Sequence, residues 1–182
     1  GDQMMQDLKI SIAKLQSGEE RSFNMVIPAK SCQLPEEHVE AIQPIVIEGT
    51  ITHAGDFFVL LANVTTRLRM QCTRCLVEFE KDVHLAIEEE LRKAEGSEDF
   101  VELSGDDDLY STFLGHEIDV GQIALEHLVL SLPIKRLCHP ECLGLCPICG
   151  QDRNKNKCEC KDENIDPRLQ ALKKILNKEN QF

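Results

Sequence analysis

The stretch FVLLANVTTRLRMQCTRCLVEFEKDVHLAI, residues 58–87, decides the fold. In its first half, every even position from Phe58 to Cys72 carries an apolar side chain or, once, a threonine. In its second half, the apolar residues fall on odd positions, from Val77 to Ile87. A period of two is typical of a strand with one buried face. The sequence therefore predicts two antiparallel strands joined by a bend at residues 72–75.

Shorter alternating segments precede this pair of strands. Residues 45–51 alternate and are followed by Ala54-Gly55-Asp56, which is typical of a hairpin turn. This hairpin would complete a three-stranded antiparallel meander. Alternation over residues 23–27 and near-alternation over residues 8–15 bring the total to as many as five strands in roughly 90 residues. We therefore expect the meander to form a barrel-like or sandwich sheet.

The pattern changes after residue 87. Residues 88–119 hold 12 acidic residues against two basic ones, which predicts an exposed loop. Asp119 then stands where a helix cap is expected, and Gln122 occupies the capping-box position three residues on. An apolar stripe with helical spacing continues to Leu132, and Pro133 ends the helix.

A second helix is predicted near the C-terminus. It opens at Asp166-Pro167, where an N-cap and a first-turn proline are favoured. The expected fold class is thus α+β, in three parts. Residues 1–91 form an antiparallel β core with a Cys-x-x-Cys hairpin, and residues 92–118 form an acidic loop or linker. Residues 119–182 supply the helix, a Cys-rich zinc-binding segment and the C-terminal helix, packed on the core.

Composition and charge limit the function classes. The chain has 182 residues and a formal net charge of −12, which argues against a broad nucleic-acid binder. The charge is uneven, because residues 133–182 hold 10 Lys and Arg against 7 Asp and Glu. No apolar run is long enough to cross a bilayer and no secretory signal is visible, so we expect a cytoplasmic protein without a membrane partner.

The cysteines are the strongest chemical signal. There are nine, and six of them fall within residues 138–160. In a reducing cytosol, clustered thiols indicate metal ligands rather than disulfides. The clearest motif is Cys146-Pro147-Ile148-Cys149-Gly150, in which two thiolates can hold one tetrahedral zinc ion from a tight turn. Gly150 permits a positive φ that lets backbone N–H groups point at sulfur.

Two groupings of the cysteines are open at this stage. In the first, two all-thiolate zinc sites form, one from Cys72, Cys75, Cys138 and Cys142 and the other from Cys146, Cys149, Cys158 and Cys160. In the second, a single site is drawn from Cys142, Cys146 and Cys149 with either Cys158 or Cys160. The one-residue spacer between Cys158 and Cys160 is tighter than usual for zinc. The predicted cofactor is one or two structural Zn²⁺ ions, and Cys32 is predicted to be a small buried apolar residue or a chance thiol outside these sites.

The sequence contains no catalytic constellation that we recognise. All-thiolate surroundings argue against a catalytic zinc with an open position. No nucleophile elbow, P-loop, dinucleotide fingerprint or His-Glu-x-x-His motif occurs, and no small-molecule substrate is indicated. We therefore expect a protein that is not an enzyme. An alternative from another class is a thiol-based redox or zinc sensor that uses Cys72 and Cys75.

The basic side chains around the last cysteines have two readings. Arg153, Lys155, Lys157 and Lys161 would either compensate the negative charge of the thiolate sites or contact phosphate. The sequence leaves both open.

Several of these segments together resemble the YceD family of bacterial proteins, which is linked to accumulation of 23S ribosomal RNA. The matching segments are 72–76 with Phe79, 118–133, 142–150 with Asn154, Cys158 and Cys160, and 166–172. The resemblance implies a cytoplasmic, non-catalytic factor in large-subunit biogenesis whose partner is rRNA or a large-subunit ribosomal protein. It implies nothing about the acidic loop, which carries no match.

Overall fold

The computed structural model describes residues 8–32, 34–94 and 111–160. By residue contacts the chain divides into two units. The first unit comprises Gly1–Cys72 and Val77–Cys138, and the second comprises Thr73–Leu76 and His139–Phe182. The C-terminal helix predicted from Asp166-Pro167 lies outside the described residues.

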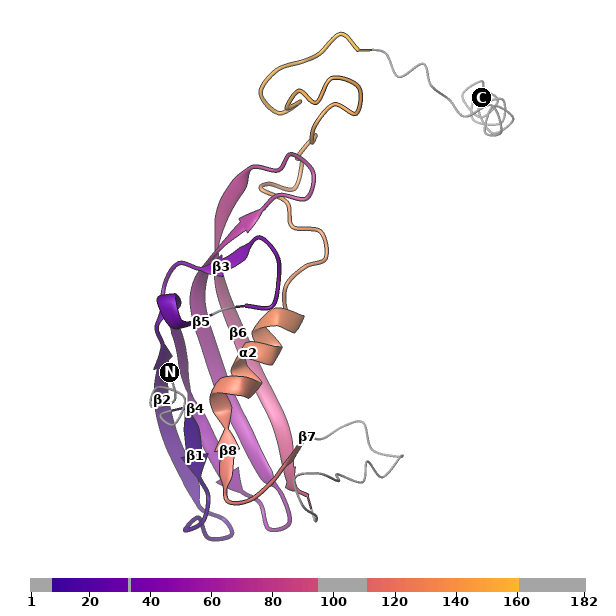
Figure 1. Ribbon diagram of the computed structural model, residues 1–182. Coiled ribbons are helices and arrows are strands. Elements are labelled where there is room, and N and C mark those ends of the chain that lie inside the picture. Colours follow the sequence, from indigo (N-terminus) through magenta and orange to yellow (C-terminus); the bar gives the residue numbers. More distant parts are fainter. Residues whose placement is uncertain (1–7, 33, 95–110, 161–182) are drawn as a thin grey trace, which may run out of the picture. The chain divides into compact units, whose positions relative to one another are not determined.

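The first unit is built on a six-stranded sheet (Figure 1). Its main order is β2-β4-β5-β6-β7, and β3 pairs with β5 beside this path. The pairs are antiparallel except for β6 and β7, which are parallel. The strands are β2 (Glu20–Ile27), β3 (Val39–Ala41), β4 (Ile45–His53), β5 (Phe58–Gln71), β6 (Glu78–Lys93) and β7 (Ser111–Phe113).

The predicted meander is confirmed. β4 and β5 form the hairpin around residues 54–57, where the N–H of Ala54 donates to the carbonyl of Phe57 at 2.8 Å. β5 pairs with β6 along the whole length of β5, from Phe58 with Leu91 to Gln71 with Glu78. The bend at residues 72–77 therefore lies between two long antiparallel strands, as the alternation predicted.

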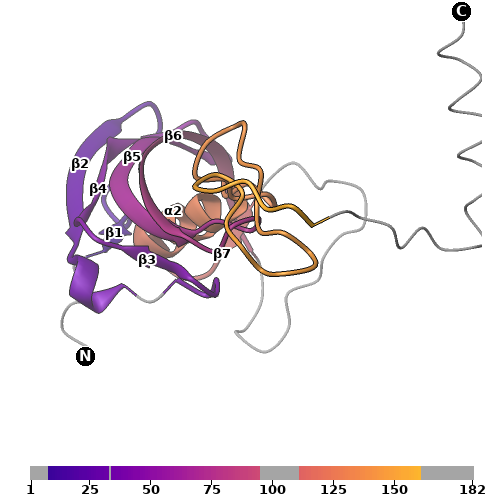
Figure 2. The same cartoon turned by 90° about the horizontal axis from the view of Figure 1, so that it is seen from above.

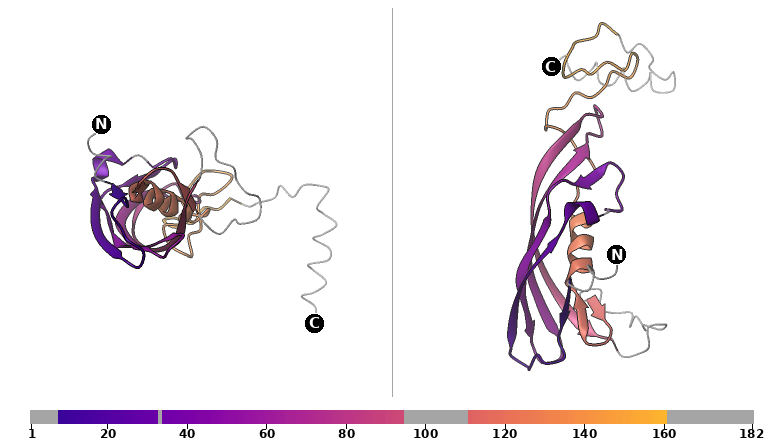
Figure 3. Two further views of the ribbon diagram at one scale, coloured as in Figure 1. Left: turned by 90° about the horizontal axis from the view of Figure 1, so that it is seen from below. Right: turned by 60° about the vertical axis from the view of Figure 1, so that its left-hand side comes forward.

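The barrel-like closure that we expected is not supported. Within the described residues, β2 and β7 end the strand order and do not pair with each other, so the sheet is open. The first predicted strand does not join this sheet. Instead β1 (Lys9–Ser11) pairs with β8 (Glu117–Asp119) in a separate two-stranded sheet. The large sheet curves around α2, as Figure 2 and the left view of Figure 3 show. The result is an α+β fold, mostly of strands.

The described part of the predicted acidic loop differs from our expectation. β6 continues to Lys93, and β7 and β8 both lie within the segment that we expected to be irregular. The run of acidic residues wrongly predicted that Glu89 would be exposed. Its carboxylate is half-buried and forms hydrogen bonds with the Ser111 hydroxyl and the His127 ring. A carboxylate with two such partners can occupy a strand position that faces the helix.

The helix α2 (Val120–Leu130) begins where the sequence predicted. The Oδ1 atom of Asp119 accepts from the backbone N–H of Gln122 at 2.9 Å, which is the expected N-cap. The Gln122 side chain does not complete a capping box, because its amide donates to Glu126 at 2.6 Å. Among residues 8–32, 34–94 and 111–160, no helix has the length and apolar character needed to span a bilayer.

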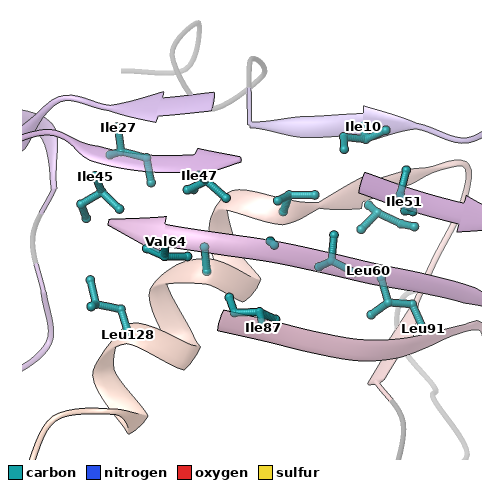
Figure 4. Packing of buried hydrophobic residues seen from close by; sticks show 14 of the residues in the cluster. Ile10, Ile27, Ile45, Ile47, Ile51, Leu60, Val64, Ile87, Leu91 and Leu128 are labelled. Atoms are coloured by element: carbon teal, nitrogen blue, oxygen red, sulfur yellow. The ribbon is translucent and has the colours of Figure 1, made fainter. Parts of the chain in front are cut away.

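The hydrophobic core of the first unit lies between the sheet and α2. Figure 4 shows side chains from β1, β2, β4, β5 and β6 directed toward one another and toward the helix. Ile45, Ile47, Leu60, Val64 and Leu128 are all fully buried there. Burial of side chains of this size stabilises a fold by about 1.5–3 kcal/mol each. This unit therefore has a conventional apolar core.

Candidate metal centre

The turn at Cys146-Pro147-Ile148-Cys149-Gly150 has the geometry that the sequence predicted. The N–H of Cys146 donates to the carbonyl of Gln151 at 2.8 Å, and the N–H of Gly150 donates to the carbonyl of Cys146 at 2.9 Å. Gly150 has a φ of +74°, in the left-handed region that glycine adopts without strain. The backbone N–H groups of Cys149 and Ile148 hydrogen-bond the Cys146 sulfur.

The bend after β5 repeats this local geometry. The N–H of Cys72 donates to the carbonyl of Val77 at 2.9 Å, five residues on, just as Cys146 donates to Gln151. Leu76 follows Cys75 with a φ of +60°, as Gly150 follows Cys149. A leucine is rare in this region of the Ramachandran plot and costs strain there. Sequence reasoning missed this likeness, because no glycine marks position 76.

The structure brings the sulfur atoms of eight cysteines into two groups. Within each group, all sulfur atoms lie within 4.8 Å of one another. Four thiolates around a tetrahedral zinc, with Zn–S bonds of about 2.3 Å, would be about 3.8 Å apart. The donor sets and their spacing thus fit an ion in each group. The first sulfur group is Cys72, Cys75, Cys138 and Cys142, and the second sulfur group is Cys146, Cys149, Cys158 and Cys160.

These two groups are those of the two-site alternative. The single-site alternative combined Cys142 with Cys146 and Cys149, whereas the structure gathers Cys142 with Cys72, Cys75 and Cys138. Cys32 belongs to neither group and packs against the apolar core. In the described part of the chain, no histidine joins either group. Ligation of an ion by these residues remains a prediction.

Burial in the second unit is confined almost entirely to thiols. Among its described residues, only Cys75, Cys142, Gly144 and Cys146 are buried. Three of its large apolar side chains face solvent, with exposed fractions of 54% for Leu76, 59% for Leu143 and 57% for Ile148, and Leu145 is half-buried. The described residues of this unit therefore lack a hydrophobic core, and their sulfur atoms occupy the place where one would be.

The second sulfur group has an uneven affinity for protons. The backbone N–H groups of Cys149 and Ile148 lower the pKa of the Cys146 thiol to about 6. The hydrogen bond with Cys149 raises the pKa of Cys160 to about 12, and the hydrogen bond with Cys146 raises the pKa of Cys158. Crowded thiols thus keep protons that a bound divalent cation would replace.

Arg74, between the two cysteines of the first turn, ties that turn to the segment around Cys142. Its Nη1 donates to the carbonyl of Cys142 at 2.8 Å, and its own carbonyl accepts from Leu145 at 3.0 Å. Gly144 has a φ of +73°, and a Cβ there would lie 3.0 Å from the Arg74 carbonyl oxygen. A glycine is required at this close approach. The spacing of the cysteines gave no indication of this role for Arg74.

Asn154, in the loop between Cys149 and Cys158, also contacts the segment around Cys142. Its Oδ1 accepts from the N–H of Leu143 at 2.7 Å, and its Nδ2 donates to the Cys142 sulfur at 3.4 Å. The loop is further fixed by Asp152, whose Oδ1 accepts from the backbone N–H of Asn154 at 3.0 Å. This bond lowers the pKa of the Asp152 carboxyl below its usual range. Sequence reasoning noted Asn154 among the segments that carry the family resemblance and assigned it no contact.

Comparison with known proteins bears on the segment that carries these sulfur groups. A family model described as large ribosomal RNA subunit accumulation protein YceD matches residues 60–176, which include all eight grouped cysteines. The chain belongs to the YceD family.

The individual relatives of this YceD-family chain are similar in sequence, but their names give no function. One uncharacterized protein of Mycobacterium bovis and two of Mycobacterium tuberculosis are each 30% identical to it over 110 residues. The alignments cover 60% of this chain and 51% of each relative, so the chain spans about half the length of the curated relatives it matches. No solved structure matches the chain significantly.

Proposed function

We propose that this YceD-family chain is a non-enzymatic, cytoplasmic zinc protein that assists 23S rRNA accumulation during large ribosomal subunit biogenesis. The ribosomal context follows from the family. One observation carries the metal proposal: among the described residues of the second unit, only thiols and one glycine are buried. A segment without an apolar core needs another source of stability, and structural zinc supplies folding free energy directly.

The donor chemistry supports zinc in a structural role. Four sulfur donors per group favour zinc or iron–sulfur clusters over hard cations. A closed set of four thiolates leaves no position for water or substrate, so it suits structural rather than catalytic zinc. When bound, each ion would cross-link four points of the chain. The residues that would hold the ions are Cys72, Cys75, Cys138 and Cys142 in one site, and Cys146, Cys149, Cys158 and Cys160 in the other.

The second unit offers a surface for a ribosomal partner. Leu143, Ile148, Arg153 and Lys157 line a hollow of about 380 Å³ beside the second sulfur group. Arg153 and Lys157 are exposed, and their cationic heads suit phosphate, while the two apolar side chains suit a base or a protein side chain. Lys155 instead lies 3.8 Å from Asp152, which fits local charge compensation. The proposed partner is rRNA or a large-subunit ribosomal protein bound at this surface.

The sensor alternative finds less support. Cys72 has an exposed fraction of 0% and Cys75 of 5%, so an oxidant in solution has little access to this pair. Redox-sensing cysteines are usually accessible. The exposed thiols are Cys149 and Cys160, in the other sulfur group. A sensor built on Cys72 and Cys75 would require the bend after β5 to open first.

The proposal is tested in two steps. Purified, never-chelated protein should contain two zinc ions per chain by elemental analysis. A strain depleted of the protein should accumulate less 23S rRNA and fewer large subunits, and the wild-type gene should restore both. Cys149→Ser should fail to restore them, whereas Cys32→Ser, which removes a thiol outside both sulfur groups, should succeed. Metal-free protein with a normal second unit, or an unchanged rRNA profile after depletion, would contradict the proposal.

A further inference from the structure

Asn154 connects the two sulfur groups. It belongs to the loop that runs from Cys149 to Cys158, both members of the second group, yet its Nδ2 donates to the sulfur of Cys142, a member of the first group. Its Oδ1 holds the N–H of Leu143, the residue directly after Cys142. One side chain thus fixes both the sulfur of Cys142 and the backbone N–H of the residue that follows it.

The orientation of this amide is determined by its partners. The N–H of Leu143 can only donate, so the atom that faces it at 2.7 Å must be the amide oxygen. The amide nitrogen then faces the Cys142 sulfur at 3.4 Å and the Asp152 carboxylate at 2.8 Å, both of which accept. An N–H directed at sulfur stabilises the thiolate form, which is the form that binds metal.

The loop that carries Asn154 is held against the backbone of Gly144 and Leu145. The N–H of Arg153 donates to the carbonyl of Gly144 at 3.0 Å, and Asp152 forms an isolated bridge with Leu145. The two ends of this loop are Cys149 and Cys158, and an ion in the second sulfur group would bind both of them. An ion there therefore restricts the loop in the conformation that aims Asn154 at Cys142.

We infer that Asn154 couples the two sulfur groups, so that metal bound by Cys146, Cys149, Cys158 and Cys160 raises the metal affinity of Cys72, Cys75, Cys138 and Cys142. The inference rests on the proposed metal function. Asn154 is a positioning residue, because it acts on a ligand and does not itself bind the ion. Thermodynamic linkage makes the coupling reciprocal, so an ion in the first group must favour binding in the second by the same factor.

The variants change the three side-chain contacts of Asn154, with Leu143, Cys142 and Asp152. Asn154→Asp keeps an oxygen for the N–H of Leu143 but places a carboxylate oxygen against the Cys142 sulfur and the Asp152 carboxylate. Asn154→Ala removes all three contacts. Asn156→Ala is the matched control, because it changes the same residue type in the same loop, where Asn156 uses its backbone N–H to bond Asp152 and its side chain is exposed.

The measurement is chelator competition on the zinc-loaded full chain. Outer-shell partners of metal ligands typically contribute about 10- to 100-fold in metal affinity, and we expect both Asn154 variants to weaken the first group by this factor. Asn156→Ala should keep both wild-type affinities. Cys75→Ser, which disables the first group, identifies the zinc step that belongs to the second.

A second background distinguishes coupling from simple support of Cys142. In Cys158→Ser the second group is disabled, so the first group should already have lost the coupling and Asn154→Ala should add little further. Equal losses from Asn154→Ala in both backgrounds, or wild-type affinities in both Asn154 variants, would overturn the inference while leaving the zinc proposal intact. Wild-type protein that binds no zinc would overturn the zinc proposal, and the coupling with it.

Discussion

Replacing Cys149 by serine should unfold the segment around the second sulfur group, residues 144–160, and leave the sheet of the first unit intact. Cys149 is exposed, so its loss removes a thiolate of the second sulfur group without opening a cavity in a packed region. Structural zinc contributes about 10–16 kcal/mol of apparent binding free energy in small peptides. Whole domains are stable by only about 5–15 kcal/mol. With no apolar core among the described residues of the second unit, this segment cannot offset the loss of its site.

Hydrogen exchange with peptide-level readout measures this prediction, together with zinc content. In the wild-type protein, amides that donate within the second unit, such as Cys146 to Gln151 and Arg153 to Gly144, should be protected. In Cys149→Ser these amides should exchange at the rate of an unfolded chain, and the zinc content should fall below two ions per chain. Protection along β4, β5 and β6 should be unchanged, because their core does not include the second sulfur group.

The control is Cys32→Ser, which removes a thiol that belongs to neither sulfur group. This variant should keep the wild-type zinc content and the wild-type protection in both units. Wild-type protection over residues 144–160 in Cys149→Ser would show that this segment is stable without the ion, and the reasoning from its lack of an apolar core would be wrong. Loss of protection in β5 as well would show that the two units do not unfold separately.

Three further predictions concern the first unit. Leu128→Ala should lower the free energy of unfolding by about 2–5 kcal/mol in urea denaturation, because a fully buried side chain is lost; an unchanged midpoint would contradict its place in the core. Gly49→Ala should lower the free energy of unfolding by about 1–3 kcal/mol in urea denaturation, because a Cβ there would collide with the Leu61 carbonyl oxygen in the neighbouring strand. Wild-type stability would mean that β4 and β5 separate easily. The two hydrogen bonds from Arg67, at 2.7 and 2.9 Å, lower the pKa of the Asp82 carboxyl. The stabilisation that the Asp82 carboxylate gives the fold is therefore present above the ordinary carboxyl pKa and is lost as the pH falls through the lowered pKa. Carboxyl NMR should show the Asp82 titration midpoint rise in Arg67→Gln, and an unchanged midpoint would refute the assignment.

The sequence predicted the parts of the fold that depend on periodicity. Strict alternation over residues 58–72 and 77–87 placed β5 and β6 and their shared bend, because one face of each strand must be buried. The N-cap at Asp119 followed from local chemistry alone. These features need only nearest neighbours along the chain, so a single sequence contains enough information.

Features that depend on distant partners were not predictable in this way. β3 and β8 are three residues long, too short for a periodic signal, and each exists because a remote strand pairs with it. Glu89 was assigned to solvent because its partners, Ser111 and His127, are distant in sequence. For the candidate site, cysteine spacing gave the candidate ligands and left two groupings open, but Arg74 and Asn154 act through contacts that no spacing reveals.

The two units are stabilised by different physical means, and this separates their responses to the environment. The first unit depends on apolar burial, which neither a chelator nor an oxidant removes. Thiols dominate the few buried positions of the second unit, and its exposed Cys149 and Cys160 are the candidate ligands that solutes can reach first. On the proposed function, loss of zinc from the second sulfur group would abolish the surface around Arg153 and Lys157 while the sheet persisted. A chain in that state would still be folded in part, but it would have lost the surface that we propose for its ribosomal partner.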